Sequence, residues 1–169
     1  RATFLRQSGA LIGLRNRSAG VECLASADGE PPFALHHLSP GEKAPQPVPP
    51  AEMRLVRLKT TATSLTTTYR TGDGIQAVLS VVLRGPELRW HLDLENRSPR
   101  DVVEVECPRV PGVRLGARGE DDFLITPNWQ GGVETADPAR SGGGSVPYPT
   151  GGAMAWLDLY EREPAHGLA

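Results

Sequence analysis

Aromatic residues are scarce in this sequence, at 5% of 169 residues. A hydrophobic core must therefore be built mainly from Leu, Val, Ile and Ala, which supply most of the 38% of residues that are hydrophobic. A chain of this length can still bury a sizeable core within one domain. We expect one β-sandwich domain over residues 1–169.

Cysteine and long apolar runs are also lacking. Cys23 and Cys107 are too few for a disulfide framework, and they do not have the spacing of metal ligands. Two readings stay open for them, a single bridge or two free thiols near strand ends. No stretch approaches the roughly 18 consecutive apolar residues of a membrane span, so we expect no membrane partner.

The chain has no excess of positive charge, since its formal net charge is -2 and its pI is near 6.1. Proteins that bind nucleic acid are usually clearly basic, so we expect no nucleic-acid partner. Arg far outnumbers Lys, which favours the codon bias of a GC-rich genome over a binding feature, and we expect a bacterial source. The chain begins at Arg1 without Met, so we expect an excised piece of a longer protein, and its start does not predict a compartment.

Turn-forming residues, by contrast, are abundant, with Gly 19 and Pro 16. They leave little room for long helices and suit short strands joined by turns. Residues 90–95 alternate between apolar and polar side chains, which is the period of a half-buried strand. Residues 96–100 have turn chemistry, and Val103 and Val105 continue the alternation in a second strand. The pattern predicts a two-layer, antiparallel all-β protein.

Other segments carry the same kind of signal, and Thr-rich composition favours strands over helices. Residues 110–150 are expected to form a long functional or mobile loop with two short strand-like pieces. We predict two or three short strands in Thr3–Leu24, a solvated connection at Gly41–Pro50, and three strands in Met53–Val82 with a turn at Thr71–Gly74. The strand-like pieces of the long loop are Val113–Leu115 and Phe123–Ile125. A last strand, or a short helix, is predicted at Ala153–Glu161, with no closing element after it.

Five short motifs carry a resemblance to known domains. In Ala10–Leu24 a strand leads through Asn-Arg-x-x-Gly into a second strand, and Leu92–Ser98 combines a strand with an Asn-x-Ser turn. These two motifs resemble the opening hairpin and the central strand of galactose-mutarotase-like β-supersandwich domains. Glu104–Arg109, Asp121–Leu124 and Ala153–Tyr160 resemble a subgroup of them, the N-terminal domains of large glycoside-hydrolase-like proteins in which a catalytic (β/α)8 barrel follows.

The resemblance implies an antiparallel two-layer supersandwich with long Gly/Pro-rich loops, whose partner is a downstream catalytic domain. It also implies that the chain is cut near its last strand, because the family continues with a Gly-Leu-Tyr-Leu-type strand where Gly167–Ala169 stand here. The catalytic carboxylates of such enzymes would lie beyond Ala169. We therefore assign no catalytic residue, no metal ligand and no cofactor.

The strongest candidate for ligand binding is Trp129, in the turn-rich stretch Pro127–Gly132. It could form a platform for a sugar ring or pack against a neighbouring domain, and the alternative is a Trp that caps the core. Asn128, Gln130 and Glu134 could add hydrogen bonds to the same site. Trp90 and Trp156 follow strand periodicity and are expected in the core.

Acidic residues are densest at Glu120, Asp121 and Asp122. They could bind carbohydrate hydroxyls, hold Ca²⁺ or act as an acid/base pair. Neighbouring residues on a strand point to opposite faces, however, so we expect a solvated or loop-capping role for these carboxylates. We retain Asp122 as a candidate because the segment Asp122–Glu134 could reach the rim of a substrate cleft.

Two histidine patterns carry weaker signals. His36 and His37 should split across the two faces of an extended segment, which disfavours joint metal ligation. His91 and Glu95 lie four apart and share a face of one strand. Mutarotase-like enzymes use His and Glu as acid and base, so this pair is the basis of an epimerase hypothesis.

The favoured function is a non-catalytic N-terminal domain of a carbohydrate-active enzyme. Fold resemblance does not carry function, so this remains an expectation. The alternatives are a free-standing carbohydrate-binding module with Trp129 as its platform, and a small aldose epimerase of mutarotase type.

Overall fold

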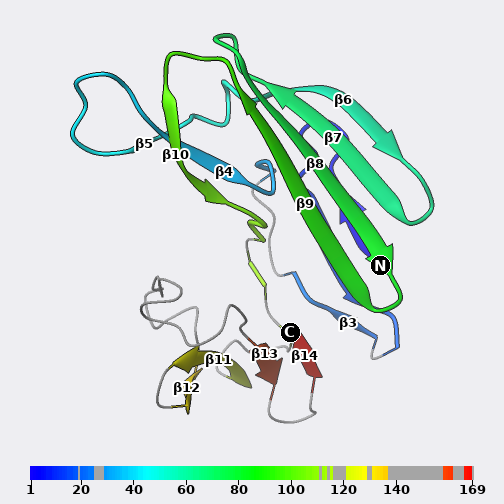
Figure 1. The fold of residues 1–169 in the computed structure, drawn as a ribbon. Coiled ribbons are helices and arrows are strands. Elements are labelled where there is room, and N and C mark those ends of the chain that lie inside the picture. Colours follow the sequence, from blue (N-terminus) through cyan, green and yellow to red (C-terminus); the bar gives the residue numbers. More distant parts are fainter. Residues whose placement is uncertain are drawn as a thin grey trace. The chain divides into compact units, whose positions relative to one another are not determined.

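The computed structural model describes residues 1–18, 20–24, 29–110, 112–113, 115, 121–128, 131–136, 158–161 and 166–168 (Figure 1). Across these ranges the protein is all-β and its paired strands are antiparallel, which confirms the predicted class at that level. None of the described segments forms a helix long and apolar enough to cross a membrane.

Two compact units make up the chain. The main unit holds Ala2–Ile12 and Ala27–Pro111, and the second unit holds Arg1, Gly13–Ser26 and Gly112–Ala169. The single domain expected over residues 1–169 remains a prediction.

The main unit is built on a four-stranded antiparallel meander in the order β6-β7-β8-β9 (Figure 1). Every second residue of β7, and of β8 as far as Val81, is buried, because successive side chains of a strand point to opposite faces. The three strands predicted within Met53–Val82, and the turn at Thr71–Gly74, are confirmed. The strands are β6 (Arg54–Thr60), β7 (Ser64–Arg70), β8 (Ile75–Arg84) and β9 (Glu87–Asn96).

A smaller sheet in the order β10-β4-β5 forms the second layer, from β4 (Ala34–Leu38), β5 (Gln46–Pro47) and β10 (Asp101–Glu106). The strands predicted on either side of residues 96–100 are therefore confirmed, but they belong to different sheets: β9 pairs with β8, whereas β10 pairs with β4. The connection expected to be solvated at Gly41–Pro50 is exposed except at Val48, and it also contributes to the fold, because Gln46–Pro47 pair with β4 and Val48 is buried.

The core of the main unit lies between these two sheets. Tyr69 is fully buried, its ring packs edge-on against Phe33 at 5.0 Å between centroids, and its hydroxyl donates to the Ser8 carbonyl oxygen at 2.7 Å. Trp90 packs against the same cluster and meets Phe4 edge-on at 6.1 Å, which confirms its predicted core role. Burial of a polar hydroxyl is tolerated at Tyr69 because the hydrogen bond offsets its desolvation.

The remaining strands form two further sheets, in the orders β1-β2-β3 and β12-β11-β13-β14. The short strands expected in Thr3–Leu24 are confirmed. Two expectations are wrong, since β12 occupies part of the region expected to be a loop, and β14 pairs with β13 where no closing element was expected. These strands are β1 (Ala2–Phe4), β2 (Leu11–Asn16), β3 (Val21–Glu22), β11 (Asp122–Asn128), β12 (Gly131–Ala136), β13 (Asp158–Glu161) and β14 (His166–Leu168).

Other predicted elements are found only in part. In the piece expected at Val113–Leu115, Val113 forms an isolated bridge with Leu24, and Arg114 lies outside the described residues. The strand expected at Ala153–Glu161 is present as β13, and Trp156 lies outside the described residues.

Substitution Gly9→Ala tests the packing around Tyr69. Gly9 has a φ of +71°, and an added Cβ would lie 2.2 Å from the Tyr69 hydroxyl oxygen. Left-handed backbone strain and the clash together should lower the free energy of unfolding by about 2–4 kcal/mol in urea denaturation. Gly29→Ala is the matched control, because its φ is +79° but its nearest atom, Leu5 Cδ2, is 3.8 Å away. Equal losses in both variants would contradict the packing argument.

Candidate functional site

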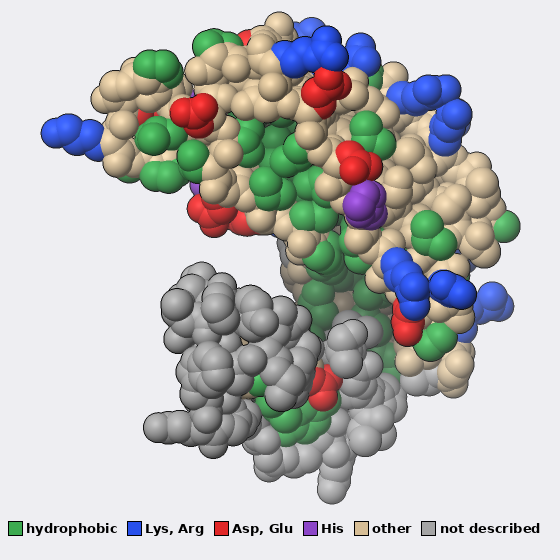
Figure 2. Space-filling model, viewed as in Figure 1, with side chains coloured by type: hydrophobic (Ala, Val, Ile, Leu, Met, Phe, Trp, Pro, Cys, Tyr) green, Lys and Arg blue, Asp and Glu red, His purple; other side chains and the backbone are tan. Residues whose placement is uncertain are grey.

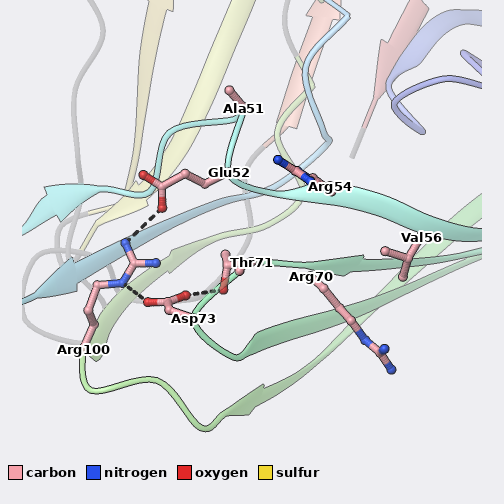
Figure 3. A pocket seen from close by; sticks show the side chains of 9 residues that line it. Ala51, Glu52, Arg54, Val56, Arg70, Thr71, Asp73 and Arg100 are labelled. Atoms are coloured by element: carbon pink, nitrogen blue, oxygen red, sulfur yellow. Dashed lines mark hydrogen bonds and ion pairs between the residues drawn. The ribbon is translucent and has the colours of Figure 1, made fainter.

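A groove of about 650 Å³ opens at one end of the main unit, where three connections meet (Figure 3). Glu52 precedes β6, Thr71 and Asp73 lie in the turn between β7 and β8, and Arg100 lies between β9 and β10. Arg54 and Arg70 come from the adjoining ends of β6 and β7. The groove thus combines three backbone connections with charged side chains of both signs.

Arg100 joins the three connections. Its Nη1 donates to Glu52 Oε2 at 3.2 Å, and its Nε lies 2.7 Å from Asp73 Oδ2, at ion-pair distance but without the alignment of a hydrogen bond. The Arg100 side chain is only 14% exposed. Thr71 Oγ1 donates to the other Asp73 oxygen, so Asp73 is held from two sides (Figure 3).

Turn chemistry positions Arg100. The Asn96 side chain accepts from the Ser98 amide at 2.9 Å and donates to the Arg100 carbonyl oxygen at 2.7 Å, as expected for an Asx turn. The Arg97 amide donates to the Gly74 carbonyl oxygen at 3.1 Å, which ties this turn to the one that carries Asp73. The predicted turn chemistry of residues 96–100 is confirmed.

The charges and hydrogen bonds around Asp73 keep its carboxylate ionised. The Arg100 guanidinium, and then the Thr71 hydroxyl, hold the pKa of Asp73 below its usual range. Reciprocally, Asp73 raises the pKa of Arg100. A carboxylate whose pKa is lowered is a poor proton donor near neutrality, so Asp73 serves as the anionic partner of an ion pair and not as an acid.

Two arginines occupy the other side of the groove. Arg54 and Arg70 are directly opposite each other in the register of β6 and β7, and both are exposed. Arg70 Nε donates to Gln76 Oε1 at 2.8 Å. Within the described part of the chain, neither arginine forms an ion pair with a carboxylate.

Among the predicted site residues, Asp122 begins β11 and is buried in the second unit. Both of its carboxylate oxygens lie 3.3 Å from the Leu115 amide, which donates to them. Asp121 is exposed, so the two neighbours do separate as expected, and Asp122 has the loop-capping contact that the sequence favoured. Glu120 lies outside the described residues.

The other three predicted residues belong to one hairpin. Asn128 pairs with Gly131 and Glu134 pairs with Ile125, so β11 and β12 bring these backbones together in the segment Asp122–Glu134. Trp129, and Gln130 with it, lies outside the described residues, between the paired Asn128 and Gly131. The assignment of Asp122, Asn128, Trp129 and Glu134 to ligand binding stays a prediction.

His36, His37 and His91 each contact a different partner. His91 Nε2 lies 3.1 Å from Asp93 Oδ1 on the exposed face of β9, whereas Glu95 is paired with Arg97. His36 contacts Glu106 at 3.0 Å, and His37 is buried with its Nδ1 3.3 Å from Ser39 Oγ. The split of His36 and His37 is confirmed, and the pair His91 and Glu95 is not brought into contact.

No metal centre is formed by the His, Cys, Asp and Glu residues that the structure describes, since no three of them are grouped to hold an ion. Cys23 and Cys107 are free thiols, and burial raises the pKa of each. A raised pKa leaves little reactive thiolate at neutral pH.

Comparison with known protein families, with curated proteins and with solved structures finds no match to this chain.

Sequence reasoning missed the groove and its arginines. Arg54, Arg70 and Arg100 are separated by 16 and 30 residues along the chain, and only the strand register brings the first two together. A usable signal was the turn Thr71–Gly74, whose Asp73 stands near the end of the same sheet as residues 96–100. Both turns lie at the same end of the meander, and from that placement their contact could have been predicted.

Replacing Arg100 by Ala should destabilise the main unit. The change removes the ion pairs that the poorly exposed Arg100 side chain makes with the partly exposed Asp73 and Glu52, at a cost of about 1–3 kcal/mol in urea denaturation. Arg97→Ala is the control, because the 79% exposed Arg97 pairs with Glu95 at the surface and its loss should cost within about 0.5 kcal/mol. Similar losses for both variants would argue against a special role for Arg100.

The Asp73 carboxylate should make stability depend on pH. Because its pKa is lowered in the folded protein, its stabilising contribution is present above the unfolded value of about 3.9 and is lost as the pH falls through the folded pKa. The melting temperature of Asp73→Asn should lie below that of the wild type at pH 7, and the gap should close below about pH 4. In an Arg100→Ala background this pH-dependent gap should shrink, and an unchanged gap there would show that Arg100 is not its cause.

Proposed function

We propose that this chain is a non-catalytic β-sandwich domain of a carbohydrate-active enzyme. In this role it packs on a downstream catalytic domain and lends the hairpin of β11 and β12 to the rim of the substrate cleft. The proposal is supported by the antiparallel all-β architecture and by the resemblance of the motifs to the N-terminal domains of large glycoside-hydrolase-like proteins.

The observation that carries the non-catalytic part is the use of the groove's two carboxylates. Glycoside hydrolysis requires one carboxyl group as proton donor and a second carboxylate placed across the substrate. Glu52 and Asp73 instead both bind Arg100, and the pKa of Asp73 is lowered. This arrangement favours joining three connections over transferring protons.

A free-standing carbohydrate-binding module is the second candidate. It is favoured by the hairpin, in which the paired residues Asn128 and Gly131 stand on either side of Trp129 in the sequence. The epimerase hypothesis receives no such support, because His91 contacts Asp93 and Glu95 contacts Arg97.

The purified chain should therefore not hydrolyse a panel of aryl glycosides, tested with a known glycosidase as positive control. Turnover that co-elutes with the protein and rises with its concentration would overturn the proposal. Loss of such turnover in Glu52→Gln and Asp73→Asn would place the chemistry in the groove.

The mass of the protein isolated from its source separates the two candidates. A mass well above the 18.1 kDa of this chain, with peptides that continue into a region of alternating strands and helices, would support an accessory domain. A mass near 18.1 kDa, with affinity for a neutral oligosaccharide that Trp129→Ala removes, would support the binding module.

A further inference from the structure

A row of four cationic side chains lies on the outer face of the large sheet. Arg54, Arg57 and Lys59 come from β6, and Arg70 comes from β7; we call these four residues the basic stripe. Arg54 is opposite Arg70, and Lys59 is opposite Thr66, so the stripe runs alongside Thr66–Arg70 of β7, a distance of four residue steps. At about 3.4 Å per residue this is roughly 13 Å. Figure 2 shows Lys and Arg side chains gathered over β6, at the upper right.

All four side chains share one face of the sheet. Arg57 is opposite Thr68, and Thr66, Thr68 and Arg70 alternate along β7 with the core residues Leu65, Thr67 and Tyr69. A bulge between Leu55 and Arg57 shifts the register by one residue, so Arg54 and Arg57 both face outward although they are three residues apart. The stripe is therefore a consequence of strand register and not of adjacency in the sequence.

The basic stripe is not neutralised by the described part of the protein. Four other arginines of the main unit bind carboxylates: Arg89 pairs with Glu87, Arg97 with Glu95, Arg100 with Glu52 and Asp73, and Arg109 with Glu30 and Glu106. Arg6, Lys43 and Arg84 have no carboxylate partner among the described residues, but they are not grouped with one another on adjacent strands. None of the four stripe residues has such a partner among the described residues. Like charges directly opposite each other in a sheet are destabilising, so Arg54 and Arg70 carry a cost that a bound anion would remove.

The surface beside the stripe is rich in hydroxyl groups. Thr66 and Thr68 on β7 are half-buried, and Ser80 on β8 pairs with Thr66. The aromatic residues of these strands, Tyr69 and Trp90, belong to the core and not to this face. Hydroxyl groups can hydrogen-bond sugar oxygens, whereas the bases of a nucleic acid need aromatic side chains for stacking.

The groove continues the stripe at one end, because Arg54 and Arg70 line it together with Thr71 (Figure 3). In the figure Arg70 extends away from the cluster of Arg100, Asp73 and Glu52. Its guanidinium is oriented by Gln76, so part of the entropy of fixing the side chain is already lost before a ligand arrives.

We propose that the basic stripe and the groove bind a linear acidic polysaccharide through its carboxylate or sulfate groups. Guanidinium groups bind such oxyanions in a bidentate manner. Arg54, Arg57 and Lys59 occupy successive outward positions of β6, which fits a ligand with repeated charges. The proposal rests on the proposed function, because it names the chemistry of the carbohydrate involved. It gives the domain the task of holding an anionic chain near the catalytic partner.

The stripe also has a second explanation, since β6 is an edge strand of its sheet. Charged residues on an edge strand oppose unwanted pairing with other chains. That role requires charge only and no ligand, so it predicts increased self-association, and no loss of polysaccharide binding, when the charges are removed.

The test compares two double variants that lower the net charge by the same amount. Arg54→Gln with Arg70→Gln removes the end of the stripe that lines the groove. Arg89→Gln with Arg97→Gln removes two exposed arginines that are already paired. Binding is measured by isothermal titration calorimetry with polygalacturonate, heparin, neutral dextran and single-stranded DNA, at two salt concentrations, and folding is checked by circular dichroism.

We expect the wild type to bind polygalacturonate or heparin and not dextran, with affinity that falls as salt rises. The stripe variant should bind at least tenfold more weakly, and the control variant should change less than twofold. Binding to polygalacturonate alone would assign carboxylates as the ligand groups, and binding to heparin alone would assign sulfates.

Three results would overturn the inference: no binding of either acidic polysaccharide, equal losses in both double variants, or equally tight binding of single-stranded DNA. None of these would decide the proposed function, which depends on the absence of glycosidase turnover and on the mass of the native protein. Conversely, glycosidase turnover by this chain would overturn the proposed function and leave the binding result valid.

Discussion

The connections of the main unit depend on the contact that Arg100 makes with Asp73 and Glu52. The chain leaves the large sheet at the end of β9 and enters the smaller sheet at β10, so the turn between them connects the two layers. A single guanidinium at that turn reaches the connection that precedes β6 and the turn between β7 and β8. Burial strengthens these ion pairs, because less water competes for the charges.

Much of the strand content could be predicted from the sequence, because alternation and turn chemistry are local. The turn of residues 96–100 and the buried face of β8 follow directly from such patterns. Which sheet a strand joins is not local. Val105 of β10 pairs with Leu35, which lies 70 residues earlier, and nothing in either short segment specifies that partner. The hairpin of β11 and β12 was obscured by its glycine content.

The candidate site was harder to predict for the same reason. Arg54 and Arg70 can be recognised as neighbours only once the register of β6 and β7 is known, because that register places them opposite each other. Overall charge was also a poor guide, because a net charge of -2 averages over surfaces of opposite character. The paired Arg89 and Arg97 lie on β9 and just after it, whereas four cations without a carboxylate partner among the described residues lie together on β6 and β7.

The order of the strands in the large sheet has a consequence for how the protein folds. Each strand of the meander pairs with its neighbour in the sequence, so its contacts are short-range and the loops to be closed are small. The pairing of β4 with β10, by contrast, closes a loop of more than 60 residues that contains the whole meander. The meander should accordingly form first and serve as the template on which the two distant strands meet, with the turn at Arg100 completing the assembly.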